Sequence, residues 1–396
     1  MAPTRPLLQI HDRRTLRLAA SPTTAASSPP LGTSIEILPK HVDDATDPVP
    51  ARALLRRMLL DALDLPARHA DEAGIEMYRV PLTEWVMRRF LAELDRLTKR
   101  GLRFDYVRLE EEQRFLRGQW DIARQMRQPP GRAHFFQIRH DVFLPDRPEN
   151  RLLRAALDKV CRKTTDPENW RLSHELALLL AEIPASTHIP ADFSAWRNDR
   201  MMTQYREVRP WCRLVLGQEM PLALQGPTTG LSMLFPMEKV FEKHVAVQLR
   251  RVLRPGVELT AQAASQYLCT HDDRPIFQLK PDLLFTHRDG RRWVMDTKWK
   301  LLNATAAREE KYDLSQDDFY QLFAYGQTYL GGKGRMALVY PKTVDFAAPL
   351  PVFRFRPDLG LELWVLPFDL EAGELVLPSG AVEWPVRPSE PARAAA

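Results

Sequence analysis

The sequence predicts an α+β amino-terminal domain followed by an α/β domain in which helices flank a mixed central sheet. Residues 51–65 and 82–100 have the apolar spacing of helices, and strand-like patches follow at 104–109 and 133–143. From residue 237 onwards, helical and strand-like segments alternate, which is typical of a mixed sheet covered by helices. A chain of 396 residues is long enough for two domains with separate cores.

The predicted boundaries divide the chain into five segments. Residues 1–34 are rich in proline, serine, threonine and alanine, a composition typical of a disordered tail. The α+β domain occupies 35–149, and a helical linking region occupies 150–230. The α/β domain extends over 231–376, and the proline-rich segment 377–396 is expected to fray.

The elements of the α/β domain follow from local patterns. In order, they are a helix over 237–253, strands around Tyr267, Leu283 and Val294, a helix over 317–330, and strands over 336–340, 352–355 and 361–366. The second helix has the clearest ends, because Ser315-Gln316-Asp317-Asp318 resembles a capping box and Gly331 and Gly332 provide a stop.

The most informative segment is a predicted β-hairpin with acidic residues on both strands. Asp289-Gly290 is a strong turn signal between two apolar runs. A turn there brings Asp282 opposite Asp296, to within about one residue of register. Side chains alternate along a strand, so Asp296 and Lys298 point to the same face. The pattern therefore predicts two carboxylates and a lysine on one surface.

Two carboxylates on one surface favour a metal-dependent site. Their repulsion is costly when they are half-buried, unless a proton or a divalent cation lies between them. Oxygen ligands of this kind suit Mg²⁺ or Mn²⁺. Lys298 could neutralise charge on a reacting phosphate, or it could orient or deprotonate the attacking water, and the sequence leaves these roles open. The alternative is structural, with Asp282 as a turn residue and Asp296 and Lys298 on a solvated strand edge.

The predicted helix over 317–330 supplies two more candidate residues. Gln321 and Tyr325 are at positions i and i+4, so both project from one face. Tyr325 could equally belong to the core stripe of this helix, together with its apolar neighbours. Gln321 fits that alternative less well, because it is polar among aromatic residues.

These residues resemble the PD-(D/E)xK nuclease superfamily, specifically its branch with a Gln-x-x-x-Tyr helix after the core lysine. Upstream stretches resemble the McrC family, the nuclease subunits of modification-dependent McrBC restriction systems. The matching stretches are Tyr106-Val107, Leu116-Arg117-Gly118, Arg139-His140-Asp141, Asp146 to Leu153, Met237 to Glu242, and the hairpin with Trp299-Lys300. The resemblance covers about Ile35 to Tyr340, and the two ends of the chain match poorly or not at all.

The resemblance implies a PD-(D/E)xK restriction-endonuclease-like fold for the α/β domain and a metal-dependent DNA endonuclease activity. Asp282 and Asp296 would bind Mg²⁺ or Mn²⁺, and Lys298 would stabilise the transition state. Gln321 and Tyr325 would position the site or the DNA backbone.

In such families a glutamate on the helix before the core sheet often assists the metal. Glu238 and Glu242 are the candidates here, and Glu242 is favoured as the third metal ligand. The alternative is that both glutamates only solvate a helix that packs through Phe241, Val245 and Leu249.

The resemblance also implies partners. They are double-stranded DNA that carries a modification, and an AAA+ GTPase of the McrB type that recognises and translocates this DNA. The α+β domain would dock on that motor. The chain has no glycine-rich nucleotide-binding loop of its own, so we do not expect it to hydrolyse nucleotides.

Composition argues against a membrane-spanning or disulfide-rich protein and is compatible with a partner that carries negative charge. No apolar run approaches the roughly 20 residues that a membrane-spanning helix needs. The three scattered cysteines indicate reduced thiols in the cytoplasm rather than a disulfide framework or a zinc site. The formal net charge of +5 is compatible with a polyanionic partner. Among the basic pairs, Arg291 and Arg292 are of most interest, because they flank the predicted hairpin.

Two rival functions stay open at this point. One is a non-catalytic scaffold that binds and activates the AAA+ partner, with the acidic residues serving the structure. The other is a stand-alone nuclease for repair or recombination, which would cleave DNA without a nucleotide-driven partner.

Overall fold

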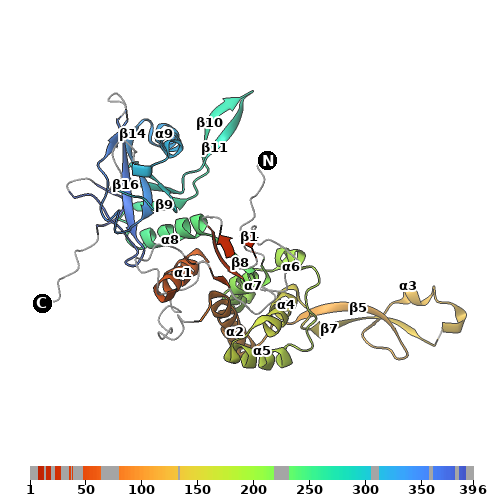
Figure 1. Ribbon diagram of the computed structural model, residues 1–396. Helices are drawn as coiled ribbons and strands as arrows, with labels where there is room; N and C mark the ends of the chain where they lie inside the picture. Colours follow the sequence, from red (N-terminus) through yellow and green to blue (C-terminus); the bar gives the residue numbers. More distant parts are fainter. Residues whose placement is uncertain are drawn as a thin grey trace. The chain divides into compact units, whose positions relative to one another are not determined.

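A computed structural model describes residues 8–12, 15–18, 23–27, 35–36, 38, 48–63, 80–132, 134–217, 232–304, 312–355, 360–379 and 383–388 (Figure 1). The chain divides into two compact units. The sheet unit comprises Met1–Ala26, Ser34–Arg79 and Leu234–Ala396, and the arm unit comprises Ser27–Thr33 and Val80–Met233. In the part of the chain that the structure describes, no helix is both long and apolar enough to cross a bilayer.

This division differs from the predicted boundaries in two respects. Residues 150–217 belong to the same unit as 80–149, rather than forming a separate linking region. Helix α1 (Pro48–Ala62) belongs to the sheet unit, because its buried face, which includes Leu55 and Met58, packs with helix α8 (Met237–Arg251).

The sheet unit is built on a seven-stranded mixed sheet. Its strands are β9 (Val257–Ala261), β12 (Leu283–His287), β13 (Arg292–Thr297), β14 (Lys333–Pro341), β15 (Phe353–Arg354), β16 (Gly360–Asp369) and β17 (Glu374–Leu375). The order is β15-β16-β14-β13-β12-β9, with β17 beside β16. Strands β13, β14 and β16 are parallel to one another, and the other pairs are antiparallel. The predicted mixed sheet is therefore present.

Helices α8 and α9 (Gln316–Leu330) lie on opposite faces of this sheet. Leu322 of α9 packs in a core cluster with Val294 of β13. Phe241 of α8 contacts Phe368 of β16, with ring centroids 6.1 Å apart. By strand register, Phe368 points to the face opposite that of Val294. Helix α9 ends at Gly331, whose φ of +65° is the left-handed conformation that favours glycine.

The strand predicted around Tyr267 lies outside the central sheet. It is β10 (Gln266–His271), which pairs with β11 (Arg274–Leu279) in a separate two-stranded ribbon. The place beside β12 is taken by β9, which the sequence did not predict. The side chains of the ribbon are mostly exposed, so the ribbon contributes little to the main core.

Both ends of the chain also differ from the prediction. Four short strands, β1 (Leu8–Asp12), β2 (Thr15–Leu18), β3 (Thr23–Ser27) and β4 (Ile35–Glu36), occur in or next to the segment predicted as a disordered tail. Strands β4, β3 and β8 (Ser232–Pro236) form a three-stranded sheet, and β1 pairs with β2. The rest of 1–34 lies outside the described residues.

Within the segment predicted to fray, Trp384 and Val386 are each 1% exposed. Trp384 packs edge-on against Trp364, so apolar burial holds residues 383–388 against the unit. Residues 380–382 and 389–396 lie outside the described residues.

The arm unit combines a helical cluster with an extended β-arm (Figure 1). The helices are α2 (Leu82–Arg100), α4 (Pro148–Lys163), α5 (Pro167–Leu179), α6 (Ile189–Ala195), the 3-10 helix η4 (Arg200–Tyr205) and α7 (Val208–Leu216). The arm comprises β5 (Asp105–Gln113), β6 (Gln119–Trp120), α3 (Ile122–Gln125), the 3-10 helix η3 (Pro130–Arg132) and β7 (Phe136–Leu144). Its sheet order is β5-β7-β6.

Asn150 anchors both ends of the arm to the helices. Its Nδ2 donates hydrogen bonds to the carbonyl oxygens of Arg103, before β5, and Pro145, after β7, at 2.8 Å each. Its Oδ1 accepts from the Tyr205 hydroxyl at 2.7 Å. Asn150 and Tyr205 are both buried, so the bond between their side chains forms away from water, and the two bonds to the carbonyls are partly buried.

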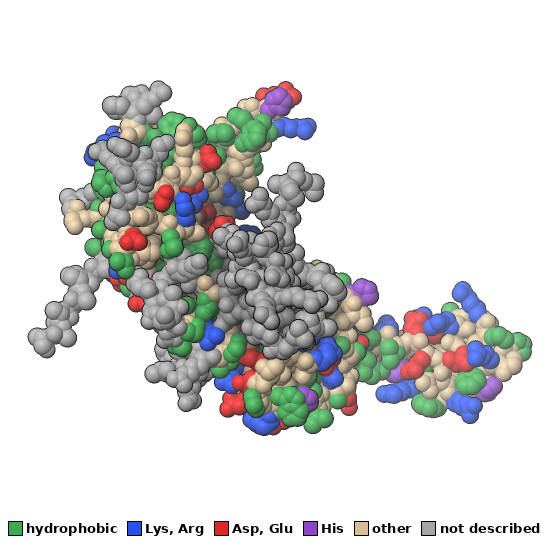
Figure 2. Space-filling view, viewed as in Figure 1, with side chains coloured by type: hydrophobic (Ala, Val, Ile, Leu, Met, Phe, Trp, Pro, Cys, Tyr) green, Lys and Arg blue, Asp and Glu red, His purple; other side chains and the backbone are tan. Residues whose placement is uncertain are grey.

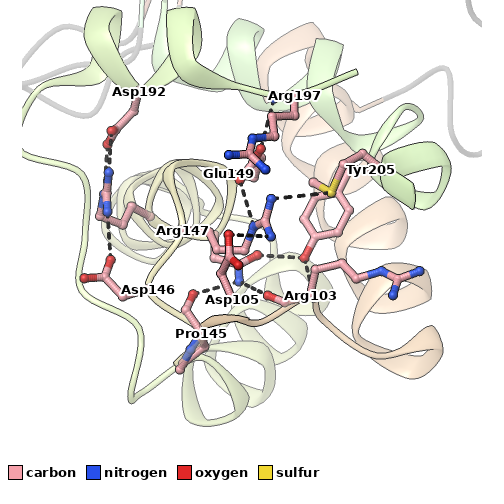
Figure 3. Close-up of polar contacts among 12 residues, drawn as sticks. Arg103, Asp105, Pro145, Asp146, Arg147, Glu149, Asp192, Arg197 and Tyr205 are labelled. Atoms are coloured by element: carbon pink, nitrogen blue, oxygen red, sulfur yellow. Dashed lines mark hydrogen bonds and ion pairs between the residues drawn. The ribbon is translucent and has the colours of Figure 1, made fainter. Parts of the chain in front are cut away.

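Glu149 and Arg147 reinforce the same junction (Figure 3). The Oε1 of Glu149 accepts from the backbone N–H of Arg197 at 3.0 Å, and its Oε2 lies 3.3 Å from Arg147 Nε. Arg147 also forms an ion pair with Asp105 at the start of β5, at 3.2 Å. The stretch from Asp146 to Asn150 is thus a structural joint of the arm.

Candidate active site

Asp282 and Asp296 lie opposite each other at the end of the β12–β13 hairpin. The observed register pairs Leu283 with Met295, which extends to Asp282 and Asp296. Asp282 Oδ2 accepts hydrogen bonds from the backbone N–H of Thr297 at 2.8 Å and from its hydroxyl at 2.7 Å. The turn contains Gly290 with a φ of +91°, as the Asp-Gly signal indicates. The hairpin geometry that the sequence predicts is therefore present.

Lys298 lies on the same surface as these two acids. Its Nζ is 2.9 Å from Asp296 Oδ2 and 3.0 Å from Asp318 Oδ1 on α9, and it donates to Gln321 Oε1 at 3.4 Å. Burial opposes the charged form of Lys298, but the carboxylates of Asp296 and Asp318 outweigh it and raise the pKa of the lysine above its usual range. Lys298 is therefore held as a cation.

The carboxylates of Asp282, Asp296 and Glu242 repel one another, and burial limits their contact with water. Burial of Asp296, and then the neighbouring charge of Asp282, raise the pKa of Asp296 to about 7, although the ion pair with Lys298 acts in the opposite direction. Burial and then the charge of Asp282 also raise the pKa of Glu242. The cluster carries more negative charge than its surroundings compensate.

Of the two candidate glutamates, Glu242 is linked to the acids of the hairpin. The Nε2 of Gln262 donates to Glu242 Oε1 and, at 3.0 Å, to Asp282 Oδ1. Glu238 lines the same cleft but is exposed. Gln262 follows β9 directly and has a φ of +52°, an uncommon conformation for a residue with a side chain. No sequence signal points to Gln262, because the pattern of residues does not predict strand β9.

Gln321 and Tyr325 are connected through a hydrogen bond between their side chains. Gln321 Nε2 donates to the Tyr325 hydroxyl at 2.7 Å, and that hydroxyl donates to the carbonyl of Lys280 at 3.1 Å. Tyr325 is only 4% exposed, so its ring packs in the core and only its hydroxyl reaches toward the site. Gln321 lines the cleft, and the hydroxyl of the core residue Tyr325 holds the Gln321 side chain through their hydrogen bond.

These residues surround a cleft of about 410 Å³. Its lining comprises Glu238, Lys239, Glu242, Asp282, Asp296, Thr297, Lys298, Trp299, Lys300, Asp318, Gln321 and Tyr340. In the described parts of the chain, no three His, Cys, Asp or Glu side chains are arranged as a ready metal cage. Instead, the Gln262 amide lies between the carboxylates of Glu242 and Asp282, and the Lys298 ammonium lies between those of Asp296 and Asp318.

One family model matches most of the chain. The model of the McrBC 5-methylcytosine restriction system component matches residues 28–341. No curated protein matches the chain.

Two solved structures from Thermococcus gammatolerans are similar to this chain. One is described as a refined half-complex from a tetradecameric assembly of McrB AAA+ hexamers with bound McrC. A chain in it matches with a TM-score of 0.64 and 20% identity, over 92% of this chain and 80% of that chain, which is a likeness of fold. The other is a cryo-EM structure of the McrBC complex, with a TM-score of 0.47 and 24% identity over 60% of this chain and 67% of that chain.

Proposed function

The chain belongs to the McrBC family of 5-methylcytosine restriction system components, and we propose from that premise that it is the DNA endonuclease subunit of such a system, with a PD-(D/E)xK site that depends on Mg²⁺ or Mn²⁺. The observation that carries the proposal is the convergence of Asp282, Asp296 and Lys298 in one cleft. The membership in this family makes a phosphodiester bond of DNA the natural substrate.

The residues in the cleft fit a divalent cation. Asp282, Asp296 and Glu242 offer hard oxygen ligands, which Mg²⁺ and Mn²⁺ prefer. Burial and then the charge of Asp282 raise the pKa values of Asp296 and Glu242, and a bound cation would favour the ionised form of both groups. When bound, such an ion would polarise a phosphate oxygen and lower the pKa of a water molecule.

Lys298 acts in this proposal as a fixed positive charge. A lysine whose pKa is raised keeps its proton near neutral pH, so it is unsuited to take a proton from water. Its ammonium can donate hydrogen bonds to the oxygens of the reacting phosphate, where negative charge grows in the transition state. Of the roles that the sequence left open, charge stabilisation is thus the one that its surroundings favour.

Gln321 and Tyr325 position Lys298 in this proposal. The chain of hydrogen bonds from Lys298 through Gln321 and Tyr325 ends on the Lys280 carbonyl, two residues before Asp282. It therefore connects the lysine to the backbone that carries the first acid. The pair would hold the distance between ammonium and carboxylates during the reaction.

The subunit would act with an AAA+ GTPase of the McrB type, which would recognise modified double-stranded DNA and translocate it. Support for this partner comes from family membership and from the fold shared with a chain of an assembly that contains McrB AAA+ hexamers. The partner would recognise the modified base, and this chain would cut.

The β-arm is the surface that we assign to the partner. Its exposed large hydrophobic side chains are Phe104, Tyr106, Phe115, Leu116, Trp120, Ile122, Met126 and Phe143. Hydrophobic and charged side chains intermingle along it in Figure 2. So much exposed apolar surface on one extension is typical of a protein-binding site.

Manganese binding tests the proposed site directly. Calorimetry with and without duplex DNA would compare the unaltered chain with Asp282→Ala and Asp296→Ala. We expect binding in the unaltered chain and its loss in both variants. An unaltered chain that binds no metal even with DNA would exclude a metal-dependent nuclease and favour a scaffold for the AAA+ partner.

A further inference from the structure

A second concave site lies at the other end of the central sheet from the acids. Asp296 is at the carboxyl end of β13, whereas Arg292 is at its amino end. This site is a pocket of about 740 Å³, larger than the cleft of about 410 Å³ at the acids. It is formed where the amino ends of the parallel strands β13, β14 and β16 meet the end of α9.

The pocket is lined by more cations than anions. Its basic residues are Arg291, Arg292, Lys333, Arg335 and Arg354, and its acidic residues are Glu362 and Glu383. Glu362 pairs with Arg335 at 3.2 Å and with Arg354 at 3.6 Å, and Glu383 pairs with Arg291. Among the residues that the structure describes, Arg292 and Lys333 form no ion pair, so their charge is available to a ligand.

The cations follow a line across the strands. Register places Arg335 beside Trp293 and Glu362, and Glu362 beside Arg354, so these side chains share one face. Lys333 points to the same face, two residues before Arg335, whereas Arg292 neighbours Trp293 and points to the opposite face, which is also that of Asp296, so the pocket extends around the ends of the strands. From β14, which carries Lys333 and Arg335, to β15, which carries Arg354, there are two strand intervals, which correspond to about 10 Å. A single phosphate would engage only part of this line, whereas about three successive phosphates of one DNA strand would cover it.

We propose that this pocket binds the phosphate backbone of duplex DNA a few base pairs away from the bond that is cut. Asp296 is four positions after Arg292 on β13 and points to the same face, so the two lie about 13 Å apart along the strand, which about four base pairs span. The inference rests on the proposed function in one respect, namely that DNA is the substrate. It adds a contact that fixes the position of the duplex relative to the acids.

Charge reversal at the two unpaired cations tests the inference. Arg292→Glu with Lys333→Glu would be compared with Arg206→Glu and Arg250→Glu, which change the charge equally at exposed positions outside the pocket. Binding of a short duplex by the full chain would be measured in Ca²⁺ over a range of salt concentrations. We expect the pocket variant to bind at least about tenfold more weakly, with a salt dependence lower by about 1.8, and the control variant to change little.

Equal losses in the pocket and control variants would overturn the inference, as would unchanged binding in the pocket variant. Competition separates the sources of phosphate. If inorganic phosphate or a free nucleoside triphosphate displaces the duplex as readily as a second duplex does, the pocket is a small-anion site and the inference fails. Two further measurements test the proposed function independently of this pocket. They are manganese binding by the pocket variant and DNA cleavage by the unaltered chain.

Discussion

The Nζ of Lys298 lies 3.0 Å from Asp318 Oδ1, across the boundary between strand β13 and helix α9. The sequence placed Asp318 in the capping box of that helix and gave it no role in the site. In the structure it is the second carboxylate, with Asp296, that keeps the lysine charged. The helix therefore contributes an acid as well as Gln321 to the control of Lys298.

Replacing Lys298 by alanine tests whether its charge serves the chemistry. We expect Lys298→Ala to lower the rate of DNA cleavage by at least about a hundredfold, because removal of one preformed donor to a developing negative charge typically costs that much. Folding and partner binding should persist, since Lys298 is partly exposed. Cleavage would be measured with the partner and GTP, and Arg250→Ala on α8 is the control. Retained cleavage in Lys298→Ala would refute the assignment of the site.

Removing the Asp318 charge should shift the pH dependence of cleavage. Asp318 helps to raise the pKa of Lys298, so Asp318→Asn lowers that pKa. If the reaction needs the protonated lysine, the loss of activity at alkaline pH begins at a lower pH in the variant. The measurement is the pH profile of cleavage from neutral pH upwards. A uniform loss at every pH would show instead that Asp318 only shapes the cleft.

The hairpin was predictable because its determinants are local. Asp289-Gly290 sets the turn, and strand alternation then fixes the relation of Asp282, Asp296 and Lys298. Gln262 and Asp318 were not predictable as site residues. Their roles depend on how β9 and α9 are placed beside the hairpin, which is a matter of tertiary packing.

Tertiary packing also explains why the domain boundaries in the structure differ from the predicted ones. Helix α1 was recognised from its apolar spacing, but the helix that it packs on, α8, begins at Met237. Nothing in residues 51–65 indicates this partner. Apolar periodicity shows that one face of a helix is buried, but it does not show which other element packs on that face.

The Asn150 joint should contribute strongly to the stability of the arm unit. Asn150→Ala leaves the carbonyls of Arg103 and Pro145 and the Tyr205 hydroxyl without this side-chain partner. We expect a loss of about 2–4 kcal/mol in the free energy of unfolding, since each buried polar group left unsatisfied costs about 1–3 kcal/mol. Urea unfolding measures it. The exposed Asn198→Ala should cost less than about 0.5 kcal/mol, and equal losses in the two variants would contradict the role of Asn150.

The contact of α1 with α8 should make stability depend on pH. Burial opposes the charge of Asp61, but its hydrogen bonds with His244 and Gln248 outweigh burial and lower the pKa of Asp61 below 3.8. Between the folded and unfolded pKa values the unfolded chain binds more protons, so stability rises with pH in that range. The contribution is present above pH 3.8 and is lost as the pH falls through the lower, folded value.

Replacement of Asp61 by asparagine would expose this contribution. The free energy of unfolding of Asp61→Asn should depend less steeply on pH below about 5 than that of the unaltered chain. Asp272→Asn is the control, because the Asp272 side chain is 89% exposed. Denaturant unfolding at a series of acidic pH values provides the comparison. Parallel curves for the unaltered chain and Asp61→Asn would rule out the contribution.

Charges introduced on the arm should separate partner binding from metal binding. Leu116 and Met126 are 57% and 83% exposed, so Leu116→Glu with Met126→Glu should leave the fold intact while placing unpaired charges in the proposed contact. We expect affinity for the AAA+ partner to fall by at least about a hundredfold and manganese binding at the acids to stay unchanged.

The matched control for the arm changes the same residue types within the same unit. Leu178 and Met201 are 79% and 67% exposed but lie on α5 and η4 rather than on the arm, so Leu178→Glu with Met201→Glu should retain the partner. If both double variants bind the partner equally well, the exposed apolar side chains of the arm serve another purpose. If only the helical variant loses the partner, docking occurs on the helices, because charge has the same disruptive effect wherever an apolar contact is buried.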